Sequence, residues 1–534
     1  MKMKRFLIVL LSVSMLLAIT VGCQSETAPT TTATTESKQT STASETTKAP
    51  APSGEEAVEQ IVMVYQLMRS IPPDNELVQN EINAYIKDLI HVSIELVPIS
   101  MGDYTQQVTL MITSKEDMDL MCTMPGGPLQ FSNMTAQNQL LDITDLLNEY
   151  GQGIIESIEN VNPKYLDATK IKGRYYAVPS NYNKVTNMYV SIRKDVLAEQ
   201  NLDLKAVKNM ADLEAILETL RENYDIPPLA YAKAGSTLLV FTNGILNFDH
   251  FEETIPIDTL GDGDFKYGII KNNDNYDIIN FYETDDYKKI VEKAHEWYTK
   301  GYIYPDAATA EESSSDIVRA NGALGNIVAS ERGVEQLENN RCGHEMEVTQ
   351  IGTGLVATNN LQKFTWALPV TCKKPEAAMK FLNLTYTDEH VINLLNFGIE
   401  GVHYVVTEDG TIDFPEGVTA ETTRYGVFMD FLFGNQFLAK VWKGNPPNLR
   451  ELSLEDNRNA EVTNTAGFVV VSTEMQDQLA AVTNVLQQYR PFLESGTSDP
   501  TTALPEMQNA LQAAGFQEIL DEVQRQLNDW LSNQ

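Results

Sequence analysis

The sequence predicts an α/β fold in which helices cover a parallel or mixed β-sheet. Apolar strand segments alternate with amphipathic helices over residues 60–150, and the alternation resumes after residue 172. The chain has 534 residues, of which 43% are hydrophobic. This composition is sufficient for large hydrophobic cores, and a chain of this length is normally divided into two or more domains.

The first elements form a β–α–β unit. We expect a strand over residues 60–65, a helix over 76–89 and a second strand over 92–97, because the strands are continuous apolar runs and the apolar residues of the helix recur at helical spacing. Ligands bind at the carboxyl ends of the strands in such sheets. The loops expected to line a site are therefore those after Val64, Val97 and Met121.

The later elements are expected from the same patterns. They are a helix and a strand within residues 110–122, a helix over 142–149, a hairpin arm over 172–179, a strand over 188–194, and helices over 195–199, 210–223, 285–300 and 375–386. Trp297 lies on the apolar stripe of the helix over residues 285–300 and is expected in the core. Residues 475–531 are expected to form two helical pieces, broken near residues 496–500, and the last helix is expected to pack against the body.

The first 22 residues have the pattern of a secretory signal peptide. A basic head precedes an apolar run over residues 6–19, which is too short for an ordinary membrane-spanning helix, and Thr20-Val21-Gly22-Cys23 resembles the lipobox of bacterial prolipoproteins. We expect cleavage after residue 22 and lipidation of Cys23, so that the protein is anchored on the extracellular face of the cell membrane. An ordinary secreted protein is the alternative. Residues 23–56 are rich in Thr, Ser and Pro and predict a disordered tether.

Charge and composition exclude several classes of function. The 74 acidic and 39 basic residues give a net charge of −35, which argues against a protein that binds nucleic acid by neutralising phosphates. Four Cys without a CxxC pair and six His without helical ligand spacing do not predict a zinc or iron–sulfur centre, and no cofactor is expected. The acidic loop with Asp258, Asp262 and Asp264 lacks the EF-hand pattern and is interpreted as solvated, not as a calcium site. One disulfide, between Cys342 and Cys372, is an open possibility.

Several ordered strings resemble one family. The strings are KGRYYAVP (172–179), IRKDVL (192–197), YTKGYIYPD (298–306) and KPEAAMKFL (374–382), together with FGIEGVHY (397–404) and the run over residues 480–530. The first four, with the signal and tether, resemble the family 1 extracellular solute-binding proteins of ABC importers. The last two resemble the large Gram-positive lipoprotein branch of that family.

The resemblance implies a clamshell of two α/β lobes with a helical C-terminal region. Residues 57–183 and 365–400 would form lobe 1, and residues 184–364 and 401–534 would form lobe 2. The chain would cross between the lobes near residues 177–188, near 364–371 and after Glu400. The family mostly binds sugars or oligosaccharides between the lobes and delivers them to a permease driven by an ATPase. This chain has no GxxxxGK[ST] phosphate loop, so the ATPase would be another polypeptide. A monomer is expected.

Candidate ligand contacts are aromatic and polar residues near strand ends and crossings. Flat apolar faces suit the C–H side of a pyranose, and polar groups suit its hydroxyls. The candidates are Tyr65, Asn181, Tyr182, Trp366, Glu400, His403 and Trp442. Each has a structural alternative: core or hinge packing for Tyr65 and Trp366, a turn residue for Glu400, a buried structural His403, and a surface anchor for Trp442 beside a Gly-Asn-Pro-Pro rim loop.

Two other functions stay open from the sequence. The same scaffold could bind an oligopeptide or a lipid-like solute, which a deep apolar pocket would favour. An extracellular polysaccharide-degrading enzyme would need only two suitably spaced carboxylates, which 74 acidic residues allow. No GxSxG or HExxH motif occurs, and the sequence favours a binding protein over an enzyme.

Overall fold

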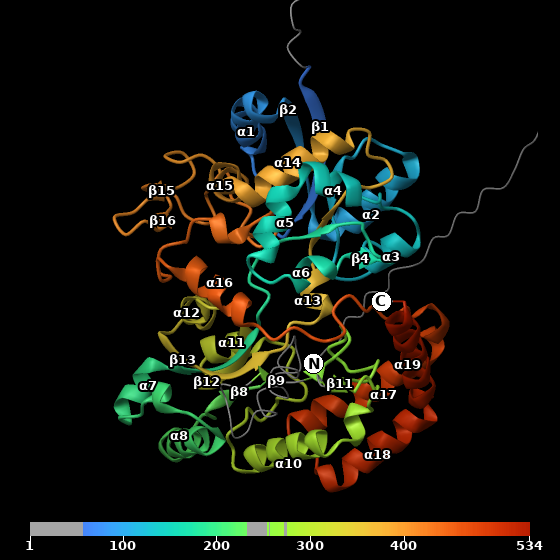
Figure 1. Ribbon diagram of the computed structural model, residues 1–534. Helices are drawn as coiled ribbons and strands as arrows, with labels where there is room; N and C mark the ends of the chain where they lie inside the picture. The colour runs from blue at the N-terminus through green and yellow to red at the C-terminus, as the bar shows by residue number, and fades with distance from the viewer. Residues whose placement is uncertain (1–56, 232–253, 256, 272–274, 534) are drawn as a thin grey trace, which may run out of the picture. The chain divides into compact units, whose positions relative to one another are not determined.

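The computed structural model describes residues 57–231, 254–255, 257–271 and 275–533 (Figure 1). The predicted signal peptide, the tether and Cys23 lie outside these ranges. Residues 56–534 form one compact unit. None of the described helices is long and apolar enough to cross a membrane. Two five-stranded sheets organise the described part of the chain.

The first sheet has the strand order β2-β1-β3-β14-β6. β1 pairs in parallel with β2 and β3, whereas β14 runs antiparallel to β3 and β6. The chain passes from β1 to β2 and then returns to the other side of β1 as β3, so the carboxyl ends of β1 and β3 flank a position where ligands bind in such sheets. The strands are β1 (Glu59–Leu67), β2 (Val92–Ser100), β3 (Leu120–Cys122), β6 (Val178–Pro179) and β14 (Thr365–Ala367).

Amphipathic helices pack on this sheet (Figure 1). In α1, Val78, Ile82 and Ile86 recur every four residues and are completely buried, and the helix ends at His91 in the left-handed conformation. The helices are α1 (Asn75–Ile90), α2 (Met101–Ser114), α3 (Phe131–Ala136), α4 (Thr144–Tyr150), α5 (Gln152–Glu159), α6 (Lys164–Asp167), α14 (Pro375–Thr387) and α15 (Glu389–Phe397). Two short hairpins join them, β4 (Lys170–Ile171) with β5 (Arg174–Tyr175), and β15 (Val405–Val406) with β16 (Ile412–Asp413).

The second sheet has the strand order β8-β12-β7-β13-β9. Its central strand β7 runs antiparallel to β12 and β13, and Ser330 at the end of β12 lies opposite Asn187 at the start of β7. The strands are β7 (Asn187–Arg193), β8 (Leu229–Ala230), β9 (Thr254–Ile255), β12 (Gly325–Ser330) and β13 (Met346–Gly354). Around them lie α7 (Lys194–Glu199), α8 (Met210–Asn223), α10 (Asp285–Thr299), α11 (Ser314–Arg319) and α12 (Val334–Cys342), with the hairpin of β10 (Ile257–Asp258) and β11 (Ile270–Lys271).

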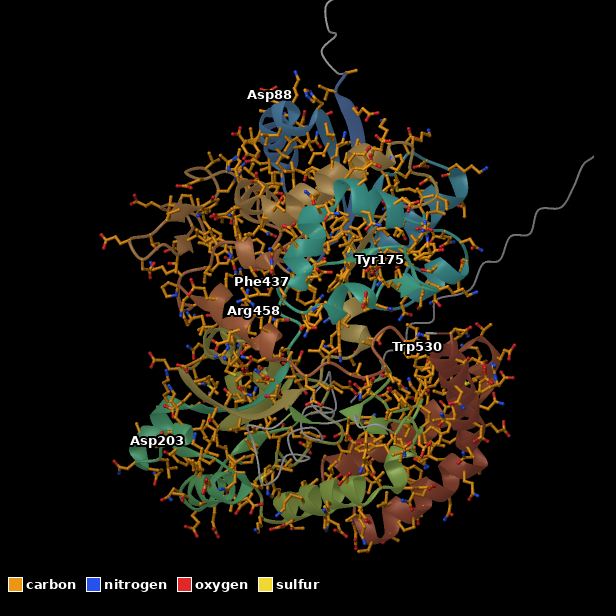
Figure 2. All side chains as sticks on the ribbon, viewed as in Figure 1. Asp88, Tyr175, Asp203, Phe437, Arg458 and Trp530 are labelled. Atoms are coloured by element: carbon orange, nitrogen blue, oxygen red, sulfur yellow. The ribbon has the colours of Figure 1, made fainter. Side chains whose placement is uncertain are left out.

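The C-terminal segment completes the core of the second sheet. It forms three helices, α17 (Gln476–Glu494), α18 (Pro500–Ala513) and α19 (Phe516–Ser532), and not the two pieces predicted from the sequence. The second break lies at Gly515, which adopts a left-handed φ of 81° that favours glycine. The predicted packing of the last helix is confirmed, because Phe516 and Leu527 are buried in the same core as Trp297, and Trp530 (Figure 2) packs against Phe468.

The division of the chain differs from the prediction between residues 401 and 462. This region was expected in the second lobe, but its apolar side chains lie in the core of the first sheet. They are Tyr404, Ile412, Tyr425, Val427, Met429, Leu432, Phe433, Ala439 and Val462. The first lobe therefore consists of the first sheet with this region, and the second lobe of the second sheet with the segment from Phe468 onward. The helix α16 (Leu449–Asn459) belongs to this region.

Three neighbouring segments cross between the lobes, over residues 180–187, 354–365 and 457–468. The amide of Gly354 donates to the Thr186 carbonyl (2.8 Å), and residue Val356 exchanges hydrogen bonds with the third crossing through Glu461 and Thr463 (2.9 Å each). The helix α13 (Thr358–Gln362) lies in the second crossing. The first crossing agrees with the predicted residues 177–188, whereas the predicted second crossing at 364–371 contains the strand β14 of the first sheet, and the observed crossing lies mostly before it.

Candidate functional site

A cavity of about 250 Å³ lies where the two lobes meet at the second and third crossings. We call it the interlobe pocket. It combines the loop after β3, the crossing helix α13, the β10–β11 hairpin loop and the start of the C-terminal segment. Its lining residues are Pro125, Gly126, Gln130, Asn133, Leu260, Gly261, Asp262, Tyr267, Thr358, Asn359, Gln362, Lys363, Phe468, Val469, Val470 and Ser472. Of the three loops predicted to line a site, the loop after β3 does so; residues following β1 and β2 do not line this cavity.

Five charged residues gather next to this pocket, and we call them the central charged cluster. Lys184 lies on the first crossing, Lys363 follows α13 and lines the pocket, and Glu331 directly follows β12. Asp430 and Arg450 come from the region that packs on the first lobe and form an ion pair. Lys363, Asp430, Arg450 and Lys184 all contribute to the electrostatic environment of Glu331, so residues from both lobes and two crossings meet here.

Burial shifts the pKa of two members of the cluster. Lys184 is 2% exposed, and burial lowers the pKa of its ammonium group well below its usual range, with the positive charge of Lys363 adding to the effect. Its Nζ lies 3.5 Å from the centroid of the Tyr182 ring and has no hydrogen-bond partner in the described part of the chain. Burial also raises the pKa of Glu331 to about 7, and the nearby Asp430 carboxylate adds to the rise.

Side-chain amides line the first crossing. The backbone N–H of Asn183 donates to Gln436 Oε1 (3.2 Å), the backbone N–H of Lys184 donates to Asn457 Oδ1 (2.9 Å), and Asn457 Nδ2 donates to Asn183 Oδ1 (2.8 Å). Several other amide atoms are buried without a hydrogen-bond partner among the described residues, namely Asn181 Oδ1, Asn183 Nδ2, Asn187 Oδ1 and both polar atoms of Gln66 at the end of β1. A buried donor or acceptor without a hydrogen-bond partner lowers the stability of the folded protein by about 1–3 kcal/mol. A hydroxyl group that reached one of these amide atoms would form a hydrogen bond and recover part of this cost.

Two of the residues predicted from the sequence lie on this crossing. Asn181 is 2% exposed and its Nδ2 donates to the Ser157 carbonyl (3.1 Å). Tyr182 is 6% exposed, lies under Lys184 Nζ and has Phe431 5.9 Å from its ring. Tyr182 thus contacts a member of the central charged cluster, and neither residue lines the interlobe pocket.

Tyr65 and Trp366 lie in the core of the first lobe. Tyr65 is 1% exposed and its ring meets Phe433 edge-on at 5.1 Å. Trp366 is fully buried, stacks on the same Phe433 with ring centroids 5.9 Å apart, and donates its indole N–H to the Leu432 carbonyl (2.8 Å). Their side chains have no surface that a solute reaches in this structure, because β1, β14 and residues 432–433 enclose them.

Glu400 and His403 lie away from the interlobe pocket, on the first lobe. Glu400 is exposed and lines a separate cavity of about 410 Å³ with Tyr85 and His390. His403 is 3% exposed; its Nδ1 accepts from the Ile399 amide (2.9 Å) and its Nε2 lies 3.3 Å from Asp74 Oδ2. His403 therefore connects two parts of the first lobe.

Trp442 packs among Phe397, Phe414 and Phe428, with ring centroids 4.6–6.3 Å away. The Gly-Asn-Pro-Pro loop that follows it lines a cavity of about 630 Å³, together with Tyr189 and the start of α12. Arg332 also lines this cavity and pairs with Asp456 through two hydrogen bonds of 2.5 and 2.6 Å. None of the five residues of the central charged cluster lines this second cavity.

The ligand-binding candidates predicted from the sequence did not include the residues of the central charged cluster. Lys184, Glu331, Lys363, Asp430 and Arg450 come from four separate regions of the chain. Lys184 stands two residues after Tyr182, so the polar composition of the first crossing was a usable signal. No pattern in the sequence connects Glu331 with Asp430.

Among the described residues, no group of His, Cys, Asp and Glu is arranged to hold a metal ion. The carboxylates of Asp262 and Asp264 pair with Lys266, and Asp264 also pairs with Arg490. Cys122, Cys342 and Cys372 are free thiols, so the Cys342–Cys372 disulfide does not form in this structure.

Two family models match the chain. One, described as bacterial extracellular solute-binding protein, matches residues 82–399, and the other, described as a domain of unknown function, matches residues 464–532. The chain is also 22% identical over 493 residues to a carbohydrate ABC transporter substrate-binding protein of Streptococcus pneumoniae, which covers 89% of this chain and 91% of that protein.

Solved structures share the fold. The N-glycan transport solute-binding protein NgtS of Streptococcus pneumoniae matches with a TM-score of 0.70 and 20% identity, over 89% of this chain and 99% of that chain. An HMO-binding, ABC-transporter-associated solute-binding protein of Bifidobacterium longum infantis matches with a TM-score of 0.57 and 14% identity, over 89% and 99% of the two chains. The predicted α/β class is thereby confirmed.

Proposed function

Because the chain belongs to the bacterial extracellular solute-binding proteins, we propose that it is the carbohydrate-binding subunit of an ABC importer and that its solute is an oligosaccharide held at the interlobe pocket. A relative that covers nearly the whole chain is named as a carbohydrate transport protein, and two structures of the same fold are named for N-glycan transport and HMO binding. These names support a carbohydrate in preference to a peptide or a lipid.

The proposal depends on one observation: residues of both lobes and of the crossings line a single polar pocket. The lining combines amide side chains from the loop after β3 and from α13 with Lys363, and the central charged cluster adjoins it. Each sugar hydroxyl both donates and accepts a hydrogen bond, which fits a lining of amides and charged groups of both signs. Tyr182 and the half-buried Phe431 supply aromatic surface next to the cluster.

The two-lobed arrangement supports a hinge mechanism. A solute that contacts both lobes favours the closed arrangement only by the difference between its affinities for the closed and the open arrangements. The three crossings are the only covalent connections between the lobes among the described residues, so rotation about them would open and close the pocket. The closed form would then dock on a permease, and Cys23 would hold the protein at the membrane through a lipid.

A hydrolase stays the second candidate for a specific reason. Glu331, with a pKa of about 7, lies near Asp430, and a protonated carboxyl with a neighbouring carboxylate is the combination that glycoside hydrolases use. We propose that this pair binds the solute without cleaving it, because Asp430 already pairs with Arg450 and accepts a hydrogen bond from Gln436 Nε2 (2.9 Å).

The test is a screen of the compact unit, residues 56–534, against oligosaccharides, with peptides as controls. At a ligand concentration of 100 times the dissociation constant, binding stabilises the folded state by about 2.7 kcal/mol, which raises the melting temperature by several degrees. We expect a shift with one class of oligosaccharide, confirmed by calorimetry, and no new saccharide fragments by chromatography. A shift with peptides alone would contradict the carbohydrate assignment, and released fragments would contradict the binding-only role.

A pair of lysine variants locates the site. Lys363→Gln removes a positive charge from the pocket lining and should weaken oligosaccharide binding about tenfold. Lys373→Gln is the matched control, because Lys373 is also exposed and its ion pair, with Asp117, lies outside the pocket. Equal affinities for the two variants would place the solute elsewhere.

A further inference from the structure

The C-terminal segment, residues 464–532, matches a family model to which no function is assigned. In this structure it does two things at once. Its helices complete the core of the second lobe, and its first residues, Phe468 to Val470 with Ser472, line the interlobe pocket. The segment is thus connected to the candidate solute site by direct contact.

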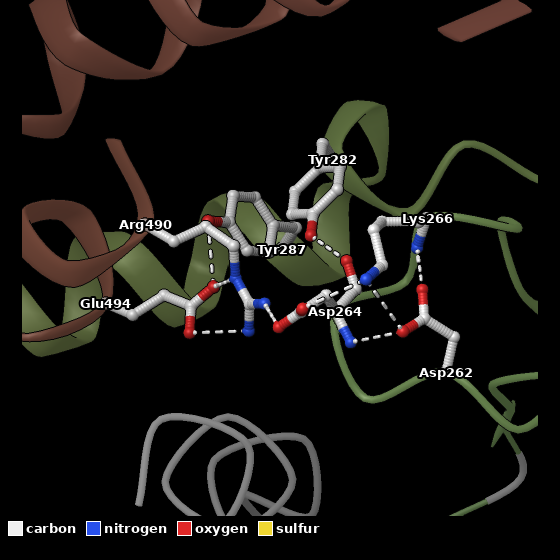
Figure 3. Close-up of polar contacts among 7 residues, drawn as sticks. All are labelled: Asp262, Asp264, Lys266, Tyr282, Tyr287, Arg490 and Glu494. Atoms are coloured by element: carbon white, nitrogen blue, oxygen red, sulfur yellow. Dashed lines mark hydrogen bonds and ion pairs between the residues drawn. The ribbon is translucent and has the colours of Figure 1, made fainter. Parts of the chain in front are cut away.

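An ion network with a buried arginine and a buried glutamate links α17 of this segment to the hairpin loop between β10 and β11 (Figure 3). Arg490 is 4% exposed; its Nε and one terminal nitrogen donate to Glu494 (2.6 and 3.1 Å), and its other terminal nitrogen donates to Asp264 Oδ1 (2.8 Å). Glu494 is fully buried and also accepts from the Tyr287 hydroxyl (3.1 Å). The guanidinium group therefore joins a helix of the C-terminal segment to a loop more than 220 residues earlier in the chain.

The same loop is held from its other side by Lys266. Its Nζ lies 3.3 Å from Asp264 Oδ2 and 3.5 Å from Asp262 Oδ1, and its backbone amide donates to Asp262 Oδ2 (2.7 Å). The Tyr282 hydroxyl donates to the Asp264 carbonyl (2.5 Å). Figure 3 shows these contacts running from Glu494 through Arg490 and Asp264 to Asp262. Asp262 lines the interlobe pocket, so the chain of ionic contacts ends at the pocket wall.

The backbone of the loop is in a conformation that needs such support. Leu260 and Phe265 both have positive φ, 55° and 53°, which costs a residue with a side chain of this size about 1–2 kcal/mol. Phe265 is fully buried against Phe281, with ring centroids 4.4 Å apart, and the Arg490 guanidinium lies 5.5 Å from its ring. A strained loop keeps its shape only where surrounding contacts determine it.

We propose that the C-terminal segment forms part of the wall of the solute site and contributes to solute affinity. Arg490 is a positioning residue in this segment, which sets solute affinity by holding the β10–β11 loop through Asp264. The proposal deepens the proposed function and rests on it. Arg490 does not line the pocket; it acts through Asp264 on the pocket residues Leu260, Asp262 and Tyr267.

The test uses Asp264→Asn on residues 56–534. The substitution removes the loop carboxylate that pairs with Arg490 and leaves the buried Arg490–Glu494 pair intact, and the Asp264 side chain is 54% exposed, so the fold should survive. The matched control is Asp195→Asn, because Asp195 is 56% exposed, pairs with Arg193 in the same lobe and does not line the pocket. Asp264→Glu, which keeps the charge, serves as the conservative variant.

We expect Asp264→Asn to weaken oligosaccharide binding three- to tenfold and to accelerate hydrogen exchange in residues 258–271 of the free protein, with Asp264→Glu closer to the wild type in both. Asp195→Asn should change neither by as much as twofold. Unchanged exchange in Asp264→Asn, or faster exchange with unchanged affinity, would overturn the positioning role. If the wild type binds no carbohydrate, the proposed function fails, and the exchange measurement alone decides whether Arg490 holds the loop.

Discussion

Replacing Glu331 by Gln should remove a pH dependence of the folding stability. Burial raises the pKa of Glu331 from 4.5 to about 7, so the folded protein keeps this proton at pH values where the unfolded chain has lost it. Between these two pH values the unfolded chain binds fewer protons than the folded protein, and the free energy of unfolding therefore falls as the pH rises. The contribution is fully present below about pH 4.5 and is lost by about pH 7.

The size of this contribution follows from the same pKa. Each tenfold change in proton affinity corresponds to about 1.4 kcal/mol, so a rise from 4.5 to about 7 sets an upper limit of roughly 3 kcal/mol. The Glu331 side chain is partly accessible to solvent, which screens the neighbouring charges and reduces the effect to about 1–2 kcal/mol. Glu331→Gln keeps the shape of a protonated carboxyl without its titration.

The assay is urea unfolding of the wild type and of Glu331→Gln at pH 4.5, 6.0 and 7.5. The stability of the wild type relative to the variant should fall by about 1–2 kcal/mol over this range, and other titrating groups cancel in the difference. Glu455→Gln, on the exposed face of α16, is the control for the chemical change from a carboxyl to an amide, and the effect of Glu331→Gln is read relative to it. A flat difference for Glu331→Gln, or one that grows with pH, would refute the assignment of a raised pKa to this residue.

Three further outcomes test the packing and the site. Leu527→Ala empties a fully buried position on α19 and should lower the unfolding free energy by about 2–5 kcal/mol in urea; a loss below 1 kcal/mol would mean that the C-terminal segment is not part of the second-lobe core. Gly496→Ala should cost at least about 2 kcal/mol by the same measurement, because Gly496 has a φ of 76° and an added Cβ would lie 2.1 Å from the Ala294 carbonyl oxygen; a neutral effect would contradict this close approach to α10. Tyr182→Leu should weaken oligosaccharide binding three- to tenfold by calorimetry. Trp366→Phe should lower the free energy of unfolding by about 1–3 kcal/mol with less than a twofold change in affinity. The reverse pattern would mean that Trp366 contacts the solute and that Tyr182 is a packing residue.

The secondary structure was largely predictable because its signals are local. The spacing of apolar residues predicted α1, α8, α10 and α14 to within about two residues at each end, and it predicted that Trp297 and the stripe of α19 are buried. Gly515 marks a break that the sequence analysis did not use, although a glycine between two periodic segments is a known end signal for a helix.

The candidate site was less predictable, since it depends on which segments meet. Tyr65 and Trp366 had the pattern of ligand contacts, an aromatic residue near a strand end or crossing, but both pack against Phe433 and are buried in the core of the first lobe. His403 was a candidate contact with a buried structural role as its alternative, and it joins Asp74 to the chain around Ile399. An aromatic or histidine side chain has the same local pattern in a core and in a binding site, and only its distant neighbours distinguish the two.

The sequence by itself determined the alternating elements, the residues that face the cores, and the family, because periodicity and ordered motifs are properties of neighbouring residues. Only the tertiary structure decided that residues 404–462 complete the first lobe, that Glu331 meets Lys184 and Asp430, and that Arg490 reaches Asp264. Burial and pKa depend on groups brought together from distant positions, and the free energy that holds a strained loop or a buried lysine comes from contacts that no local pattern contains.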